Sequence, residues 1–572
     1  MQKGVPQVMD ITSIRSILHY LSKEILPSKF ETAQQPEPNT IQLCFRGLNN
    51  QSWIEVSWHG NYARIMGIDR PEKIGSESTL SKQLRYGLKY MALISIKQDR
   101  FERVIKFEFA KKPGDEISKY LVFELMGKHS NIFYLDKNQK IITLGKQMKL
   151  NQSSFRSIST GSIYSEPPSK NKKEPSEEES YDSWKESITK IPESLKDSLI
   201  NTYQGVSPVL TKQIEVLSEL GSYEIMDKNV EIISEVNLKK IYKSWVIWIH
   251  RFKTNNFNFS IFDNFFYCVW FPENKTKHST DLINGIENYY NFHLKQKKIE
   301  TLITKIDGII FKQTNIEKKN LNMQYDLLTK SENHKLLKEK ADLIFAVQEI
   351  EKKDVIKGQK LYKKVKKLKR AKQLIEERIL IYKNKLERLE EFNAFLENLN
   401  SLKDEQLNAK VKLLEEIKDE ICSEFNINTN SLKAERKKNS EIESLPIELK
   451  TPEGLSIQIG RNMRQNDLIS FKFSKKGDIW FHAQESPGSH VVLKSSSQEA
   501  SEQDLQIAAD LAALFSKAKR NIKVPINLVK IKDLQKIEKG GPGCVSFKNG
   551  EIIWGNPTRG EDYIKKNLKT VI

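Results

Sequence analysis

The chain has 572 residues and a formal net charge of +19 at pH 7, from 93 Lys and Arg against 74 Asp and Glu. This length predicts several domains, and the excess of positive charge favours a polyanionic partner, either nucleic acid or an acidic membrane surface. No run of about 18 apolar residues occurs and the N-terminus lacks the apolar segment of a signal peptide, so we expect a cytoplasmic protein with no membrane span. The four cysteines and nine histidines are scattered, which argues against a zinc site or a disulfide framework.

Residues 9–164 are predicted to form a mixed α+β domain, because helical and strand-like patterns alternate along them. Helices are expected over 9–26 and 79–91. The buried stripe of the first helix is predicted to be Ile11, Ile14, Ile17, Leu18 and Leu21. Strand-like alternation occurs in residues 40–47, 52–60, 62–68, 102–110, 119–127 and 131–136.

Two stretches of this domain carry more polar groups than a fold requires. In QDRFERVIKFEF an acidic residue precedes arginine twice, as Asp99-Arg100 and Glu102-Arg103. Neighbouring strand residues point to opposite faces, so one member of each pair can line a given surface, and a plain surface pair remains the alternative. ELMGKHSN, residues 124–131, follows an apolar strand and fits a structural turn or a ligand-binding loop equally well.

Residues 165–183 are rich in proline, serine and charge and are predicted to be a flexible linker. The segment 184–272 that follows contains a helix–turn–helix pattern. Gly205 makes its bend, and Ser207 caps the second helix with Pro208 at the first helical position. Such a turn can aim backbone N–H groups at a phosphate, and an ordinary helical corner is the alternative.

Residues 273–445 contain no proline and are predicted to form a long antiparallel coiled-coil hairpin. Apolar residues recur there at steps of three and four, the pattern of a coiled-coil seam. The predicted seam consists of Ile299, Leu302, Ile306, Ile309, Ile316, Met323 and Leu327 in the outgoing helix, and Ile375, Ile379, Tyr382, Leu386, Leu389 and Leu396 in the returning helix.

Between the two seams, residues 352–372 hold eleven Lys and Arg against the single acid Asp354. Gly358 and the weak seam predict that the hairpin reverses about here. The reversal would place a dense positive cluster at the tip, suited to phosphate groups. A solvated lysine-rich face is the alternative.

Residues 446–560 are predicted to form a small α+β domain. Strands are expected in 455–459, 468–473, 478–483, 490–494, 526–532, 544–550 and 551–555, with a helix over 496–520. Two loops, GRNMRQND and ESPGSH, combine glycine with hydrogen-bonding side chains. They flank Trp480 and His482, which we expect to be exposed. The alternative, a plain sheet domain with glycine turns, would not explain the polar side chains of these two loops.

These stretches resemble the NFACT family of RqcH-like ribosome quality-control factors. GRNMRQND with DIWFHAQESPGSHVVLK is similar to the signature of the NFACT-R domain. FERVIKFEF, ELMGKHSNIFYLD and QGVSP occur in the order expected of NFACT-N and its helix-hairpin-helix segment, and LYKKVKKLKRA resembles the start of the returning coiled-coil arm. The resemblance extends from about Met9 to about residue 560.

The resemblance implies a non-enzymatic factor without catalytic residues, metal or cofactor. Such a factor binds a stalled large ribosomal subunit that carries peptidyl-tRNA, and recruits alanyl-tRNA. It thereby directs mRNA-independent alanine tailing of the nascent chain for degradation, while the ribosome makes the peptide bonds. A small RNA-binding assisting factor is a further implied partner, and no membrane is involved.

The resemblance also implies site residues. The family's acidic-Arg pair aligns with Glu102-Arg103, with Glu where Asp is more familiar, and Lys128 stands where Arg is common. The residues implied to bind tRNA are Glu102, Arg103, Glu124, Lys128, His129, Asn131, Arg461, Asn462, Arg464, Asp467, Trp480, His482, Ser489 and His490. Those implied to bind the ribosome are Lys363, Lys364, Lys366, Lys367, Lys369 and Arg370, on a hairpin whose tip is shorter than in the family.

Two other functions stay open. A DNA-repair glycosylase would need an N-terminal amine nucleophile, which Gln2-Lys3 and Met9-Asp10 do not supply. A fibronectin-binding adhesin would need a route to the cell surface, for which the sequence offers no signal peptide.

Overall fold

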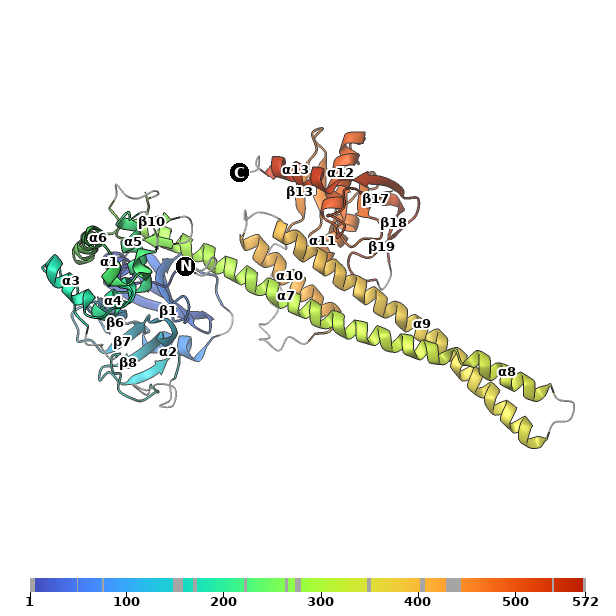
Figure 1. Ribbon diagram of the computed structural model, residues 1–572, viewed down its shortest axis with the longest axis horizontal. Coiled ribbons are helices and arrows are strands. Elements are labelled where there is room, and N and C mark those ends of the chain that lie inside the picture. Colours follow the sequence, from blue (N-terminus) through green and yellow to red (C-terminus); the bar gives the residue numbers. More distant parts are fainter. Residues whose placement is uncertain are drawn as a thin grey trace. The chain divides into compact units, whose positions relative to one another are not determined.

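The computed structural model describes residues 6–48, 50–74, 77–147, 158–167, 172–220, 224–262, 266–272, 279–346, 351–401, 407–427, 444–537 and 540–568. The chain divides into two compact units, residues 1–297 and 298–572 (Figure 1). Both combine helices with antiparallel sheets, so the prediction of an α+β multidomain protein is confirmed. None of the described helices combines the length and apolarity that a membrane span requires.

The first unit is built on a nine-stranded sheet of order β4-β3-β2-β1-β5-β6-β7-β8-β9, in which neighbouring strands are antiparallel. Its strands are β1 (Ser28–Glu37), β2 (Thr40–Arg46), β3 (Gln51–Ser57), β4 (Arg64–Ile68), β5 (Ala92–Gln98), β6 (Val104–Ala110), β7 (Lys119–Glu124), β8 (Asn131–Asp136) and β9 (Ile141–Leu144). Helix α1 (Ile11–Ile25) contacts β4 and β5, and α2 (Thr79–Gly87) contacts β1 and β9. Sequence patterns missed β1, β5 and β9.

Helix α1 begins where the sequence predicts. The carboxylate of Asp10 caps it by accepting a hydrogen bond of 2.8 Å from the Ser13 backbone N–H. All five residues of the predicted stripe are buried in the core of this unit. The apolar face of α1 therefore fixes the helix against the sheet by burial from water.

A helical segment completes the first unit. It contains α3 (Tyr181–Thr189), α4 (Leu195–Thr202), α5 (Pro208–Leu217), α6 (Glu235–Thr254) and the short strands β10 (Phe259–Phe262), β11 (Phe266–Cys268) and β12 (Ser279–Thr280). The predicted α4–α5 turn is confirmed. Ser207 caps α5 by accepting from the Leu210 N–H at 3.3 Å, Pro208 is the first helical residue, and Gly205 has a φ of +73°.

The prediction of a flexible linker over 165–183 is wrong for its second half. Glu179 is buried, and its carboxylate accepts a hydrogen bond of 2.9 Å from the Tyr203 hydroxyl and pairs with Lys173. Helix α3 begins at Tyr181. Residues 172–183 therefore belong to the folded helical segment, because their carboxylate and aromatic groups find partners that composition cannot reveal. Residues 168–171 lie outside the described residues.

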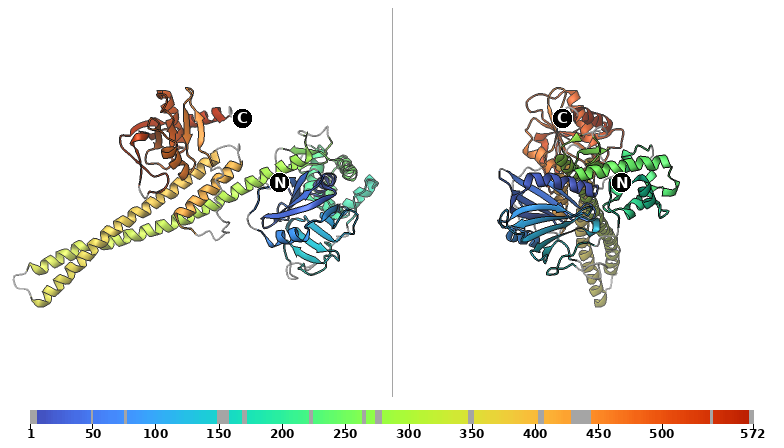
Figure 2. Two further views of the ribbon diagram at one scale, coloured as in Figure 1. Left: turned by 180° about the vertical axis from the view of Figure 1, so that it is seen from behind. Right: turned by 90° about the vertical axis from the view of Figure 1, so that its left-hand side faces the viewer.

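Long helices form the next part of the chain. These are α7 (Leu282–Ser331), α8 (His334–Phe345), α9 (Lys352–Ser401) and α10 (Leu407–Glu424). Helices α8 and α9 run antiparallel side by side (Figures 1 and 2), and Phe345 stacks on Tyr362 between them. Gly358 lies inside α9, so the chain reverses before Lys352 and not at the glycine. Residues 347–350 lie outside the described part.

The predicted seam is buried at the base of the hairpin, and further along it Ile375 and Ile379 of α9 are also buried, as predicted. Ile299, Leu302 and Ile306 pack with the α9 residues Leu389 and Leu396. Helix α10 adds a third apolar face to this base through Leu413, Leu414, Ile417 and Ile421. By contrast, Ile316, Met323 and Leu327 are exposed, which contradicts their place in the seam. The buried face of α7 beyond the base instead runs through Glu317, Gln324 and Ser331, at steps of seven. For Ile316 and Met323, the prediction therefore chose the apolar residue next to a buried position.

The C-terminal part contains a six-stranded sheet of order β13-β14-β16-β15-β17-β20 and a two-stranded β18-β19 hairpin. The strands are β13 (Ile447–Lys450), β14 (Ser456–Ile459), β15 (Ile479–Ala483), β16 (Val491–Leu493), β17 (Val524–Lys530), β18 (Leu534–Lys536), β19 (Val545–Phe547) and β20 (Glu551–Gly555). The helices are α11 (Met463–Asp467), a π-helical turn η6 (Leu468–Lys472), α12 (Glu502–Leu514) and α13 (Pro557–Leu568). The strand predicted over 468–473 is wrong, because the cap at Asn462 starts a helix that continues through η6.

Candidate nucleic-acid interface

In the first unit, Glu102-Arg103 and the α4–α5 turn line one pocket of about 350 Å³. Its lining residues are Phe101, Glu102, Arg103, Lys172, Ile200, Gln204, Gly205, Val206, Ser207 and Pro208. Two stretches that lie a hundred residues apart in sequence therefore share one surface. Lys172 and Gln204 were not predicted, because no local pattern marks them.

Arg103 is half-buried in this pocket and has charged neighbours on two sides. Burial lowers the pKa of its guanidinium, while the carboxylates of Asp10 and Glu102 oppose that shift. Burial raises the pKa of Asp10, and Arg103 opposes that shift. No described residue accepts a hydrogen bond from the Arg103 guanidinium, which stays charged in proteins. Its donors are thus available to an anionic ligand, and Asp10 is a neighbour that the sequence did not reveal.

Gly205 allows the turn to approach Phe101 closely. A Cβ on this glycine would lie 2.9 Å from the Phe101 carbonyl oxygen. We expect Gly205→Ala to lower the free energy of unfolding by about 1–3 kcal/mol more than Gly114→Ala does. Gly114 also has a positive φ, of +94°, but an added Cβ there meets nothing within 4 Å.

Urea titration with hydrogen exchange over residues 99–110 and 203–217 measures this difference. The Gly114→Ala variant reports the cost of the backbone conformation alone. If both variants lowered the free energy of unfolding equally, a Cβ at position 205 would not clash with Phe101.

The 124–131 turn divides into structural and exposed residues. Glu124 is buried and accepts a hydrogen bond of 2.9 Å from the Tyr164 hydroxyl. The buried Asn131 amide bonds both backbone groups of Lys146, at 2.8 and 2.9 Å. These two side chains hold the turn together, which contradicts a direct contact with RNA. Lys128 and His129, on the exposed 3₁₀ turn η1 (Gly127–His129), remain accessible.

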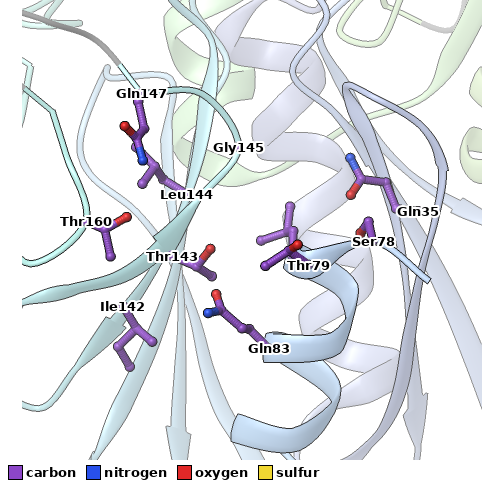
Figure 3. Close-up of a pocket in the computed structure, with 11 residues that line it drawn as sticks. Gln35, Ser78, Thr79, Gln83, Ile142, Thr143, Leu144, Gly145, Gln147 and Thr160 are labelled. Atoms are coloured by element: carbon purple, nitrogen blue, oxygen red, sulfur yellow. The ribbon is translucent and has the colours of Figure 1, made fainter.

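A second pocket of the first unit, of about 400 Å³, lies between β1, α2 and β9 (Figure 3). Gln35, Gln83 and Thr143 lie around it. Its described lining contains no ionisable side chain. Such a site lacks the positive charge that phosphate binding requires, so the Arg103 pocket is the better candidate.

In the second unit, the GRNMRQND loop is held by two carboxylates of α10, the half-buried Glu416 and the buried Glu420. Asn462 caps α11 by accepting from the Gln465 N–H at 2.8 Å and donates to Glu416 at 3.0 Å. Glu420 accepts from the backbone N–H groups of Met463 and Arg464, at 3.2 and 3.3 Å. Burial raises the pKa of Glu420 to about 7, against the effect of these donors. Asn462 is therefore buried as a cap, which contradicts its prediction as an RNA contact.

The charged residues of this loop differ in accessibility. The Arg464 side chain is 57% exposed, with its Nε 3.7 Å from Glu420. The half-buried Arg461 guanidinium donates to the Leu445 carbonyl oxygen. Asp467 pairs with Lys536 at 2.7 Å. Arg464 is thus the residue of this loop best placed to meet a phosphate.

Trp480 is 1% exposed, which contradicts the prediction of an exposed indole. It stacks on His482 with ring centroids 5.5 Å apart, and His490 stands edge-on to it. The β18-β19 hairpin covers this face of the sheet through Phe547. A ring enclosed in this way cannot stack on a base.

The neighbouring polar residues share this burial. Ser489 and His490 are buried, and His490 Nδ1 lies 2.8 Å from the Ser470 hydroxyl. Burial lowers the pKa of His482 to about 4, and it lowers that of His490 as well, so both are neutral at pH 7. Trp480, Ser489 and His490 therefore belong to the core, and His482 is half-buried beside them.

The six predicted basic residues of α9 are all exposed: Lys363, Lys364, Lys366, Lys367, Lys369 and Arg370. No ion pair within the described part of the chain neutralises any of them. Solvated cations at this density attract polyanions over about a Debye length.

Comparison with known proteins shows which family models and relatives match this chain. The NFACT N-terminal and middle domains match residues 10–356, and the NFACT protein RNA-binding domain matches residues 447–549. The Rqc2 homolog RqcH of Streptococcus suis is 26% identical over 589 aligned residues, covering 96% of this chain and 98% of that protein. The Rqc2 homolog RqcH of Bacillus subtilis is 24% identical over 571 residues, covering 94% and 96%.

Two solved structures come from the fibronectin/fibrinogen-binding protein of Streptococcus suis. Its C-terminal part is 27% identical and covers 47% of this chain and 98% of that structure, with a TM-score of 0.39. Its N-terminal part is 21% identical and covers 50% and 99%, with a TM-score of 0.37.

Proposed function

Because the chain belongs to the NFACT family, we propose that it acts in ribosome-associated quality control as an RNA-binding factor and not as an enzyme. In this role it binds a stalled large ribosomal subunit with its peptidyl-tRNA and recruits alanyl-tRNA. The ribosome then adds alanines to the nascent chain without mRNA, which marks the chain for degradation.

The observation that carries the proposal is the pocket shared by Arg103 and the α4–α5 turn. Its half-buried guanidinium offers a planar fork that matches two phosphate oxygens. Partial burial strengthens such a contact, because the effective dielectric constant there is lower than in water. Lys172 adds a second positive charge to the same pocket. We assign this pocket to a phosphate of the tRNA backbone.

The other exposed residues supply further RNA contacts. Lys128 and His129 of the first unit, and Arg464 and His482 of the second, offer charge and hydrogen-bonding groups to tRNA. The basic residues of α9 serve ribosomal RNA by long-range attraction, which makes binding sensitive to salt. A small RNA-binding protein that assists the cycle is a further partner in this scheme.

Sequencing of the RNA that co-purifies with the tagged chain tests the proposal. We expect enrichment of large-subunit ribosomal RNA together with alanine tRNA over total cellular RNA. An Arg103→Ala variant should retain the ribosomal RNA and lose most of the tRNA. Recovery of neither RNA would overturn the proposal, as would excision of damaged bases from duplex DNA by the purified chain.

A further inference from the structure

A cluster of exposed tyrosines and cations surrounds the C-terminal end of α2 in the first unit. Tyr86 and Tyr90 are 69% and 65% exposed, which is unusual for side chains with so much apolar surface. The residues around them are basic. We define the basic–tyrosine patch as Tyr86 and Tyr90 with Lys29, Lys82, Arg85 and Lys89.

The cations of the patch are held over the tyrosine rings. Lys29 Nζ lies 4.7 Å from the Tyr90 ring centroid, and Lys89 Nζ lies 4.9 Å from it. Arg85 Cζ lies 5.3 Å from the centroid of Tyr86. Each exposed ring therefore has at least one cation close to it. The cation–π contacts keep these charges near the rings, although lysine and arginine side chains are flexible.

The backbone at Tyr90 is strained. Tyr90 has a φ of +68°, in the left-handed region that bulky residues rarely adopt. The turn closes with a hydrogen bond of 3.0 Å from the Met91 N–H to the Leu88 carbonyl oxygen. Gly87 allows α2 to pack close to Tyr134, since an added Cβ would collide with that ring. Strain of this kind at an exposed aromatic residue points to a binding role.

The strand register extends the positive charge beyond the patch. Ala92, just after the turn, pairs with Lys29 on β1 and with Ala110 on β6. Ala110 is followed by the exposed Lys111 and Lys112. The acids nearby are Glu77, which pairs with Arg85, and the exposed Asp115 and Glu116 after β6.

We propose that the basic–tyrosine patch binds an unpaired segment of RNA, with bases stacked on Tyr86 and Tyr90 and phosphates on the surrounding cations. This rests on the proposed function only for the class of ligand. Base stacking on an aromatic ring exceeds an exposed cation–π contact in strength, so a base can displace a lysine, which then meets the adjacent phosphate. A lipid surface is disfavoured, because large aliphatic groups that would insert are not part of the patch.

Fluorescence anisotropy with a labelled oligouridylate of about 12 nucleotides tests the proposal on the full chain. We expect the double variant Tyr86→Ala/Tyr90→Ala to bind at least tenfold more weakly than the unchanged chain. The double variant Tyr86→Phe/Tyr90→Phe keeps both rings and should bind within twofold. Tyr325→Ala removes an exposed tyrosine of α7 and should have no effect.

Three results would overturn the proposal. These are no oligouridylate binding by the unchanged chain, equal binding by the alanine variant, or equal loss in the alanine and phenylalanine variants. If the Tyr86→Ala/Tyr90→Ala variant lost binding to anionic phosphatidylglycerol vesicles but bound oligouridylate as well as the unchanged chain, the patch would be assigned to membranes instead. Failure here is separable from failure of the tRNA proposal, because Tyr86→Ala/Tyr90→Ala leaves Arg103 in place and Arg103→Ala leaves both tyrosines in place.

Discussion

Substitution of Arg103 by alanine is expected to weaken tRNA binding by about 10- to 100-fold. A charge-assisted hydrogen-bonded contact contributes about 1.5–3 kcal/mol, and Arg103 is a half-buried cation of its pocket. The variant should keep its fold. Asp10 keeps the hydrogen bond from the Ser13 N–H that caps α1, and removal of Arg103 should raise the pKa of this carboxyl further. Filter binding at low salt measures the change in affinity.

Two matched variants sharpen this test. Arg103→Lys keeps the charge and loses the planar fork, so its affinity should fall between those of Arg103→Ala and the unchanged chain. Arg100→Ala removes the neighbouring arginine, whose exposed side chain pairs with Glu174 at 2.6 Å. We expect that variant to bind tRNA normally. Equal losses at the two positions would mean that only net charge matters and that the pocket has no specific role.

Local sequence patterns predicted the elements whose partners are close in sequence. The cap at Ser207 and the buried stripe of α1 follow from side chains within one turn of each other. The polar strand β1, which reads SKFETAQQPE, has too few apolar residues to show alternation, yet it pairs with β2 and β5 inside the sheet. Its formation depends on strands elsewhere in the chain.

Burial by distant segments explains the errors at the candidate sites. Trp480 looked exposed because it lies beside polar loops, but the β18-β19 hairpin more than fifty residues later encloses it. Ile316 and Met323 fit a seam by spacing alone, but α7 turns the neighbouring polar residues Glu317 and Gln324 toward its buried side, which an apolar pattern cannot reveal. For the Arg103 pocket, the sequence indicated both Glu102-Arg103 and the α4–α5 turn as candidate contacts, but it did not indicate that the two lie together.

Neutralising the basic run of α9 is expected to lower affinity for the large ribosomal subunit by on the order of 1,000-fold at low salt. The variant replaces six residues with glutamine, which forms helices nearly as well as lysine and arginine, so α9 should persist. The substituted residues are Lys363, Lys364, Lys366, Lys367, Lys369 and Arg370. Each phosphate contact that is lost should reduce the slope of log affinity against log salt by about 0.9, or by about five for all six.

A control variant with the same net charge as the α9 variant separates a specific contact of α9 from general electrostatic attraction. Glutamine replaces six exposed lysines of the helical segment: Lys190, Lys228, Lys239, Lys240, Lys243 and Lys253. These lie outside α9, so this variant should lose affinity only through weaker long-range attraction, and its salt slope should change little. Sedimentation with purified large subunits between about 50 and 200 mM salt measures both slopes. If the two variants gave the same slope, the run on α9 would be a solvated face without a ribosomal contact.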